Sequence, residues 1–142
     1  MGTSFTQLSG HGFWTTDSKL EVWLMALCDE VDARREQPEW LTEARDHWQL
    51  QATGGFGGCV AAGLDEIVGS DPSRVAAVRE LASNAIDRLR SDRTLTRQVL
   101  TTNSDGGVEW RVGVEAIVPV ARAFDDLLAG RLTTDAATSP VF

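Results

Sequence analysis

The residues whose spacing best suits chemistry are Glu43 and His47, four positions apart in a stretch of helical character. On a helix this spacing puts both side chains on one face, where they could share a metal ion or act as an acid–base pair. It also gives an ordinary hydrogen bond on a helix surface, and we favour that interpretation. Other metal ligands are scarce, since the second histidine is His11 and the only cysteines, Cys28 and Cys59, form no CxxC motif. The sequence therefore predicts no metal site and no cofactor.

A glycine-rich run, TGGFGG at 53–58, is the second feature that could bind a ligand. A P-loop needs Lys and then Ser or Thr after its last glycine, but Cys59 comes next. A dinucleotide-binding loop needs a third glycine at a position where the chain has Val60. We therefore favour a tight connection between two helices. The alternative is that the backbone amides of residues 57–59 face an anionic ligand at the start of the next helix.

A nucleophilic catalytic centre has little support in the sequence. The chain has no GxSxG motif, and Cys28 falls on an apolar helical stripe, where a thiol is normally inert. Cys59 is the better candidate, because a helix expected at 59–68 would place it at a helix N-terminus, which makes a thiol more reactive. We predict no catalytic residue and leave open whether the protein is an enzyme.

The chain has five tryptophans and no tyrosine. Trp23 and Trp48 fall on apolar stripes by helical period and are expected in the core. Trp14 and Trp40 lie near expected helix starts, where an indole is more often partly exposed. Such a residue either staples the start of the helix or anchors a ligand or partner.

Amphipathic periodicity predicts the elements that position these residues. The clearest stripe is that of Leu20, Trp23, Leu24, Leu27 and Val31, because these positions share one helical face. The fold class is mainly α: a single-domain bundle of about five helices. The expected helices lie at 17–35, 38–53, 59–68, 71–90 and, since Pro119 should begin the last one, about 119–129.

A small β-hairpin near 97–114 is the remaining element. Alternation of apolar and polar residues at 108–114 follows the turn sequence NSDGG at 103–107, which favours a hairpin. A loop followed by a helix is the competing interpretation. Residues 1–13 are expected to be a lead-in, 14–132 the helical domain and 133–142 a frayed tail.

Composition excludes several classes of protein. The chain has 142 residues, enough for one core, with 13 basic and 21 acidic side chains and a net charge of −8. General nucleic-acid binding is not expected, because phosphates demand clustered Lys and Arg. No apolar run approaches the ~18 to 20 residues of a membrane span, and the start has no secretion signal, so we expect a cytoplasmic protein.

The negative charge is concentrated in the first half. Residues 1–53 carry nine acidic and four basic side chains, whereas residues 54–100 carry six of each. A solvated helix face is the ordinary explanation of such an excess. The alternative is a docking surface for a basic protein partner, with electrostatic attraction raising the association rate.

Several short segments resemble those of a known group of proteins. They are GHGFW at 10–14, LEVWL at 20–24, WLTEARDHW at 40–48, GFGGC at 55–59 and LDE at 64–66. Together they resemble a family of small, uncharacterised bacterial proteins of actinobacterial type. The resemblance covers about the first half of the chain and implies a bacterial, cytoplasmic source, with no activity, cofactor or site residue attached.

Two functional hypotheses follow. The first is a non-catalytic interaction module, comparable to immunity, antitoxin or regulatory accessory proteins, and we favour it because the first half is acidic and catalytic motifs are lacking. The second is a small-molecule or enzymatic pocket around His47, Cys59 and the glycine run at 54–58. The candidate binding residues for the two hypotheses are Trp14, Trp40, Glu43, His47, Phe56 and Cys59.

Overall fold

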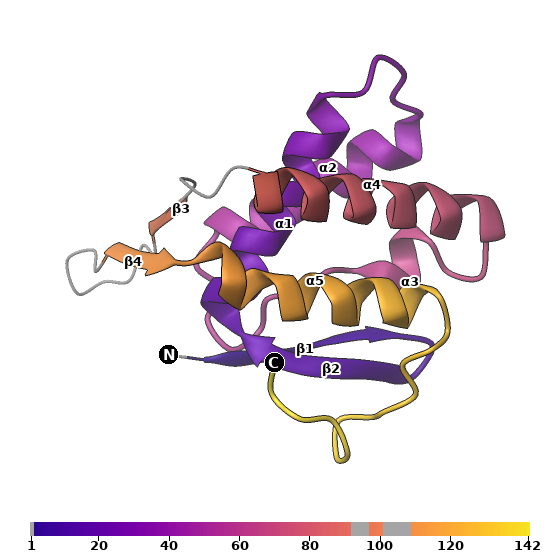
Figure 1. The fold of residues 1–142 in the computed structure, drawn as a ribbon. Helices are drawn as coiled ribbons and strands as arrows, with labels where there is room; N and C mark the ends of the chain where they lie inside the picture. The colour runs from indigo at the N-terminus through magenta and orange to yellow at the C-terminus, as the bar shows by residue number, and fades with distance from the viewer. Residues whose placement is uncertain (1, 92–96, 101–108) are drawn as a thin grey trace.

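The computed structural model describes residues 2–91, 97–100 and 109–142, with the backbone alone in the two short strands at 97–100 and 109–112. The described part is mainly helical, as the sequence predicts, with small antiparallel hairpins (Figure 1). In chain order the elements are β1 (Thr3–Leu8), β2 (His11–Thr16), α1 (Asp17–Asp32), α2 (Glu39–Thr53), α3 (Leu64–Ile67), α4 (Pro72–Ser91), β3 (Arg97–Leu100), β4 (Glu109–Val112) and α5 (Val114–Leu128).

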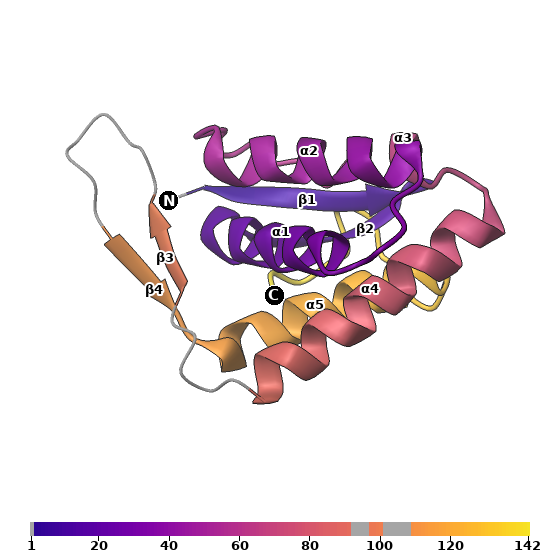
Figure 2. The ribbon, with the colours of Figure 1, turned by 90° about the horizontal axis from the view of Figure 1, so that it is seen from above.

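Helix α1 is the central element of the core. It lies between α2 on one side and the pair α4 and α5 on the other (Figure 2). Its predicted apolar stripe is fully buried, and the Trp23 ring meets Phe124 of α5 edge to face at 5.6 Å. Trp48 of α2 is equally buried, while Trp14 and Trp40 are half-buried, so the exposure of these tryptophans is as predicted.

The first 13 residues, predicted as a lead-in, instead form most of an antiparallel hairpin. Strand β1 pairs with β2 from Thr3 opposite Thr16 to Leu8 opposite His11. The turn at Ser9 and Gly10 has φ of 53° and 82°, the backbone that a two-residue hairpin turn requires. The sequence hides this hairpin because its inward positions include polar residues, so hydropathy does not alternate. The buried polar residues on the two strands are Ser4, Thr6 and Thr15.

The tail at 133–142, predicted as frayed, packs along β2. The Phe142 amide donates to the Trp14 carbonyl at 2.8 Å, and the Gly12 amide donates to the Thr134 carbonyl at 2.8 Å. The Phe142 ring meets Phe13 edge to face at 5.6 Å. The tail therefore covers the outer edge of the hairpin, which explains why this edge strand is not left open.

The predicted hairpin near 97–114 is present, with β3 antiparallel to β4 from Arg97 opposite Val112 to Leu100 opposite Glu109. The turn expected at 103–107 lies outside the described residues. The predicted start of the last helix at Pro119 is wrong, because α5 begins at Val114 and runs through this proline. Pro119 is exposed and lies in the second turn, so the helix loses one backbone hydrogen bond and keeps its buried apolar stripe on the other side.

The predicted helix at 59–68 is also wrong for most of its length, since only α3, at 64–67, is helical. Residues 59–63 carry no regular element, and Val60 and Ala62 are buried at alternate positions. The segment is held from the side by polar groups: the Val60 amide donates to Ser4 Oγ at 3.0 Å, and the Ala61 amide donates to Gln51 Oε1 at 2.9 Å.

Candidate functional site

Three of the six predicted site residues, Trp40, Glu43 and His47, line one cleft of about 330 Å³ between α2 and the segment that carries α3. They occupy successive turns of α2, on the side next to the buried face of Leu41, Ala44 and Trp48. Opposite them lie Ala61, Gly63, Glu66, Ile67 and Arg74. We call this feature the α2–α3 cleft.

The His47 ring is fixed in the wall of this cleft. Its Nε2 lies 3.0 Å from the Ala61 carbonyl, so Nε2 carries a hydrogen and donates to that oxygen. Gly63 makes room for the ring, because a Cβ there would lie 2.7 Å from Nε2. Gly63 also has a φ of +66°, which side chains other than glycine rarely adopt. The geometry therefore gives His47 a positioning contact and shows why the chain has glycine opposite it.

Trp40 joins α2 to the start of α4. The Arg74 guanidinium lies over the indole at 5.1 Å from the ring centroid, a cation–π contact. Arg74 also donates to the Ile67 carbonyl at 3.0 Å and lies 3.7 Å from the Asp71 carboxylate. The indole is thus held in one orientation before any ligand arrives.

Among the described residues, the charged side chains that line the cleft are Glu43, Glu66 and Arg74, and Arg74 is the one that has a carboxylate partner, Asp71 at 3.7 Å. The two glutamate side chains are exposed, and in the described part of the chain neither forms an ion pair or a hydrogen bond. Some other carboxylates of α1 and α2 are paired, as when Arg45 donates to Asp32 at 3.0 Å. The α2–α3 cleft therefore has two unpaired carboxylates beside an oriented, partly exposed indole, and the Arg74 guanidinium lies over that indole.

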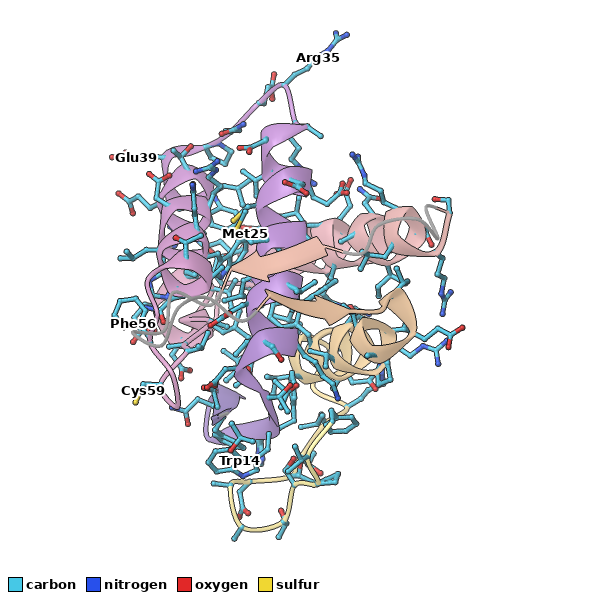
Figure 3. The ribbon with its side chains drawn as sticks, turned by 90° about the vertical axis from the view of Figure 1, so that its left-hand side faces the viewer. Trp14, Met25, Arg35, Glu39, Phe56 and Cys59 are labelled. Atoms are coloured by element: carbon cyan, nitrogen blue, oxygen red, sulfur yellow. The ribbon has the colours of Figure 1, made fainter. Side chains whose placement is uncertain are left out.

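The other three predicted site residues lie elsewhere. The Trp14 ring packs against Phe5 at 5.2 Å, and its Nε1 donates to the Ala136 carbonyl at 2.8 Å. Phe56 and Cys59 are exposed on the glycine connection after α2 and lie away from Trp14 (Figure 3). The structure does not bring the six residues into a single pocket.

The backbone amides of the glycine connection are not arranged to bind an anion. The Gly58 amide donates to Asp17 Oδ2 at 2.7 Å, and the Cys59 amide donates to the Phe56 carbonyl at 2.8 Å. Two of the three amides considered for an anion are therefore already used. Cys59 also lies five residues before α3, so the expectation that it begins a helix is wrong.

The sequence analysis did not predict a buried polar cluster, Asp17 and Glu21, on the first turns of α1. The Asp17 carboxylate accepts hydrogen bonds from Ser4 Oγ and from the Gly58 amide, and it joins β1 to the glycine connection. Glu21, one turn later, is only 6% exposed, and its Oε2 has no hydrogen-bond partner among the described residues. Burial, and secondly the Asp17 charge, raise the pKa of Glu21 to about 7. The spacing of the two acids was visible in the sequence, but the hairpin that helps to bury this end of α1 was not.

The described part of the chain contains no group of three or more His, Cys, Asp or Glu side chains arranged to hold a metal ion. No described helix combines the length and hydrophobicity needed to cross a membrane. Comparison with family models, characterised proteins and solved structures finds no match to this chain.

Proposed function

We propose that this protein is a non-catalytic interaction module of the regulatory accessory, immunity or antitoxin kind, which binds a basic partner protein at the α2–α3 cleft. The observation that carries the proposal is the pair of exposed, unpaired carboxylates, Glu43 and Glu66, on the two sides of a cleft where the one described lining cation, Arg74, already pairs with Asp71 and covers Trp40. The resemblance of the first half to small bacterial proteins supports a bacterial, cytoplasmic setting.

The chemistry suits an Arg or Lys side chain from the partner. Such a cation would lie between the two carboxylates and exchange hydration for charge-assisted hydrogen bonds. Trp40 offers an apolar surface to the aliphatic part of that side chain, and a preoriented tryptophan is a common energetic centre of an interface. The net charge of −8 would also steer a basic partner toward the protein.

An enzymatic pocket receives less support. In the part of the chain that the structure describes, no Ser, Thr, Cys or Lys lines the α2–α3 cleft, and His47 uses Nε2 for the Ala61 carbonyl. Cys59, the thiol that the alternative hypothesis invokes, lies outside this cleft. A base without a neighbouring nucleophile is a poor basis for covalent catalysis.

The test is a comparison of charge variants. The double variant Glu43→Lys/Glu66→Lys reverses the charge of the cleft, and Asp87→Lys/Glu115→Lys makes the same change in net charge at exposed positions elsewhere. Each tagged protein is incubated with extract of the source organism, captured proteins are quantified by mass spectrometry, and the best candidate is purified for calorimetry.

We expect a basic protein to bind the wild type and the control variant, and to bind the cleft variant at least about tenfold more weakly. Its affinity should also fall as salt is added, because the contacts are charged and partly exposed. Equal binding of the purified partner to the cleft variant and the control would refute the proposal, as would the absence of any basic protein whose capture depends on Glu43 and Glu66.

A further inference from the structure

A second and larger cleft, of about 530 Å³, lies where the turn of the N-terminal hairpin meets the start of α4 and the end of α5. These segments come together on the right-hand side of Figure 1. The volume is within the range of sites that hold small molecules. We call it the hairpin cleft, and no residue of the α2–α3 cleft lines it.

The hairpin cleft differs from the rest of this acidic protein in its chemistry. Among the described residues its lining contains no Asp or Glu, whereas that of the α2–α3 cleft has two. Five of the lining residues have large aliphatic side chains, and they come from three separate stretches of the chain. These aliphatic residues are Leu8, Val75, Leu127, Leu128 and Leu132. The cleft is therefore suited to the apolar body of a ligand.

Arg79 supplies a polar group at this apolar wall. Its Nε donates to Asp125 Oδ1 at 2.9 Å and its Nη2 to Asp125 Oδ2 at 3.4 Å, which fixes the guanidinium. Among the described residues its Nη1 has no hydrogen-bond partner. Asp125 is shared with Arg131, which also pairs with Asp126, so the four groups are neutral in sum. Arg79 thus offers the cleft a charge-assisted donor rather than a net positive charge.

His11 is held at the other wall. Its Nδ1 lies 2.9 Å from the Thr133 carbonyl and therefore donates to it. This contact fixes the ring and connects the hairpin turn to the chain that follows α5. The polar side chains of Arg79 and His11 thus line the cleft in fixed orientations, and aliphatic side chains line the rest of it.

We propose that the hairpin cleft binds an aliphatic monocarboxylate, with the carboxylate accepting a hydrogen bond from Arg79 Nη1 and the hydrocarbon chain packing on the leucines. An amine head is disfavoured because the described lining has no Asp or Glu, and the nearby Asp125 carboxylate is already paired with Arg79 and Arg131. A neutral alcohol keeps the apolar contact and loses the charge-assisted hydrogen bond. The proposal stands independently of the interaction with a basic protein.

The first test uses octanoate, octanol and octylamine, which share a hydrocarbon chain and differ in the head group. Binding is followed by calorimetry and by the NMR signals of the His11 ring and the leucine methyl groups. We expect octanoate to bind more tightly than octanol, and octylamine to bind least. Octylamine binding as tightly as octanoate, or no saturable binding of octanoate up to millimolar concentration, would overturn the proposal.

A second test places the site. Ala76→Trp fills the cleft from α4, and Ser83→Trp puts the same side chain on an exposed position of α4 that does not line it. We expect the first variant to lose octanoate binding and the second to keep it. If octanoate bound the two tryptophan variants equally well, its site would lie elsewhere and the proposal would be wrong.

A third test addresses the arginine. Arg79→Gln should weaken octanoate binding about tenfold and leave octanol binding unchanged. Asp125→Asn removes the competing carboxylate, so it should strengthen octanoate binding several-fold. This opposite pair of effects separates a role in binding from a loss of folding, because a merely unfolded variant would not bind octanoate more tightly. Unchanged octanoate affinity in both variants would contradict the role of Arg79.

Discussion

Glu21 should make the stability of this protein depend on pH near neutrality. The side chain is buried beside Asp17, and its Oε2 has no partner in the described part of the chain. Burial and the neighbouring charge raise its pKa from the ordinary value of 4.5 to about 7. The folded state therefore binds this proton more tightly than the unfolded state, and the protonated form stabilises the fold.

The sign and size follow from proton linkage. Below pH 4.5 Glu21 is protonated in both states and has no effect on the free energy of unfolding. As the pH rises from there through about 7, stability falls, because ionisation occurs in the unfolded state and is opposed in the folded one. Each unit of difference between the folded and unfolded pKa values corresponds to about 1.4 kcal/mol, so the full loss in the free energy of unfolding is about 3 kcal/mol.

The variant Glu21→Gln has nearly the same shape and cannot ionise. Its stability relative to the wild type should rise by about 2 to 3 kcal/mol between about pH 5 and about pH 8. Urea denaturation followed by tryptophan fluorescence measures this, since Trp23 and Trp48 are fully buried in the folded state. Glu43→Gln, at an exposed position, is the control and should show no such rise. Parallel pH profiles for Glu21→Gln and the wild type would refute the reasoning.

Three further substitutions test how the framework is held, each by denaturation at constant pH. Trp48→Phe should cost about 2 to 4 kcal/mol, because it leaves a gap in the core and removes the Nε1 donor that lies 2.9 Å from the Ala62 carbonyl; a cost below about 1 kcal/mol would contradict this. Ser4→Ala should cost about 1 to 3 kcal/mol, because the buried Val60 amide loses its acceptor; an unchanged midpoint would mean that this bond contributes nothing. Pro119→Ala should stabilise the protein by about 1 kcal/mol or more, since alanine restores a backbone donor inside α5; destabilisation would show that the proline ring makes a needed contact.

The long helices could be read from the sequence because each buries a broad apolar stripe. The stripes of α1 and α4 predicted helices at 17–35 and 71–90, and the structure has them at 17–32 and 72–91. Local signals also sufficed for the hairpin of β3 and β4, where a strong turn sequence precedes alternating residues.

The errors occur where tertiary contacts decide the local structure. Ser4 and Thr6 look like surface residues, yet both are buried. Ser4 is bonded to Asp17 and to the Val60 amide, whereas Thr6 Oγ1 has no hydrogen-bond partner among the described residues. The segment at 59–63 has the composition of a helix, but polar groups from β1 and α2 hold it out of one. The tail has no periodic pattern of its own, and its order comes from hydrogen bonds to β2, which the sequence analysis did not predict.

The candidate site was predictable only within one element. Glu43 and His47 were identified by their helical spacing, and Trp40 by its place near the start of the same expected helix. Glu66 and Arg74, which complete the α2–α3 cleft, come from segments whose approach to α2 is not encoded in any local pattern. The hairpin cleft was missed altogether, since three segments distant in the sequence form it.

The geometry of the α2–α3 cleft does not depend on the charges proposed to recognise a partner. Two donors on α2, Trp48 Nε1 and His47 Nε2, fix consecutive carbonyls of the segment before α3, at 2.9 Å and 3.0 Å. This pair of contacts holds α3, and with it Glu66, opposite Glu43. Neither carboxylate takes part in the contacts that hold the segment, so the charge of both can be reversed without changing those contacts. Exposed substitutions of this kind usually change the free energy of unfolding by less than about 0.5 kcal/mol. A loss of partner binding in the charge-reversal variant would therefore report on recognition, whereas a change at Trp48 would report mainly on folding.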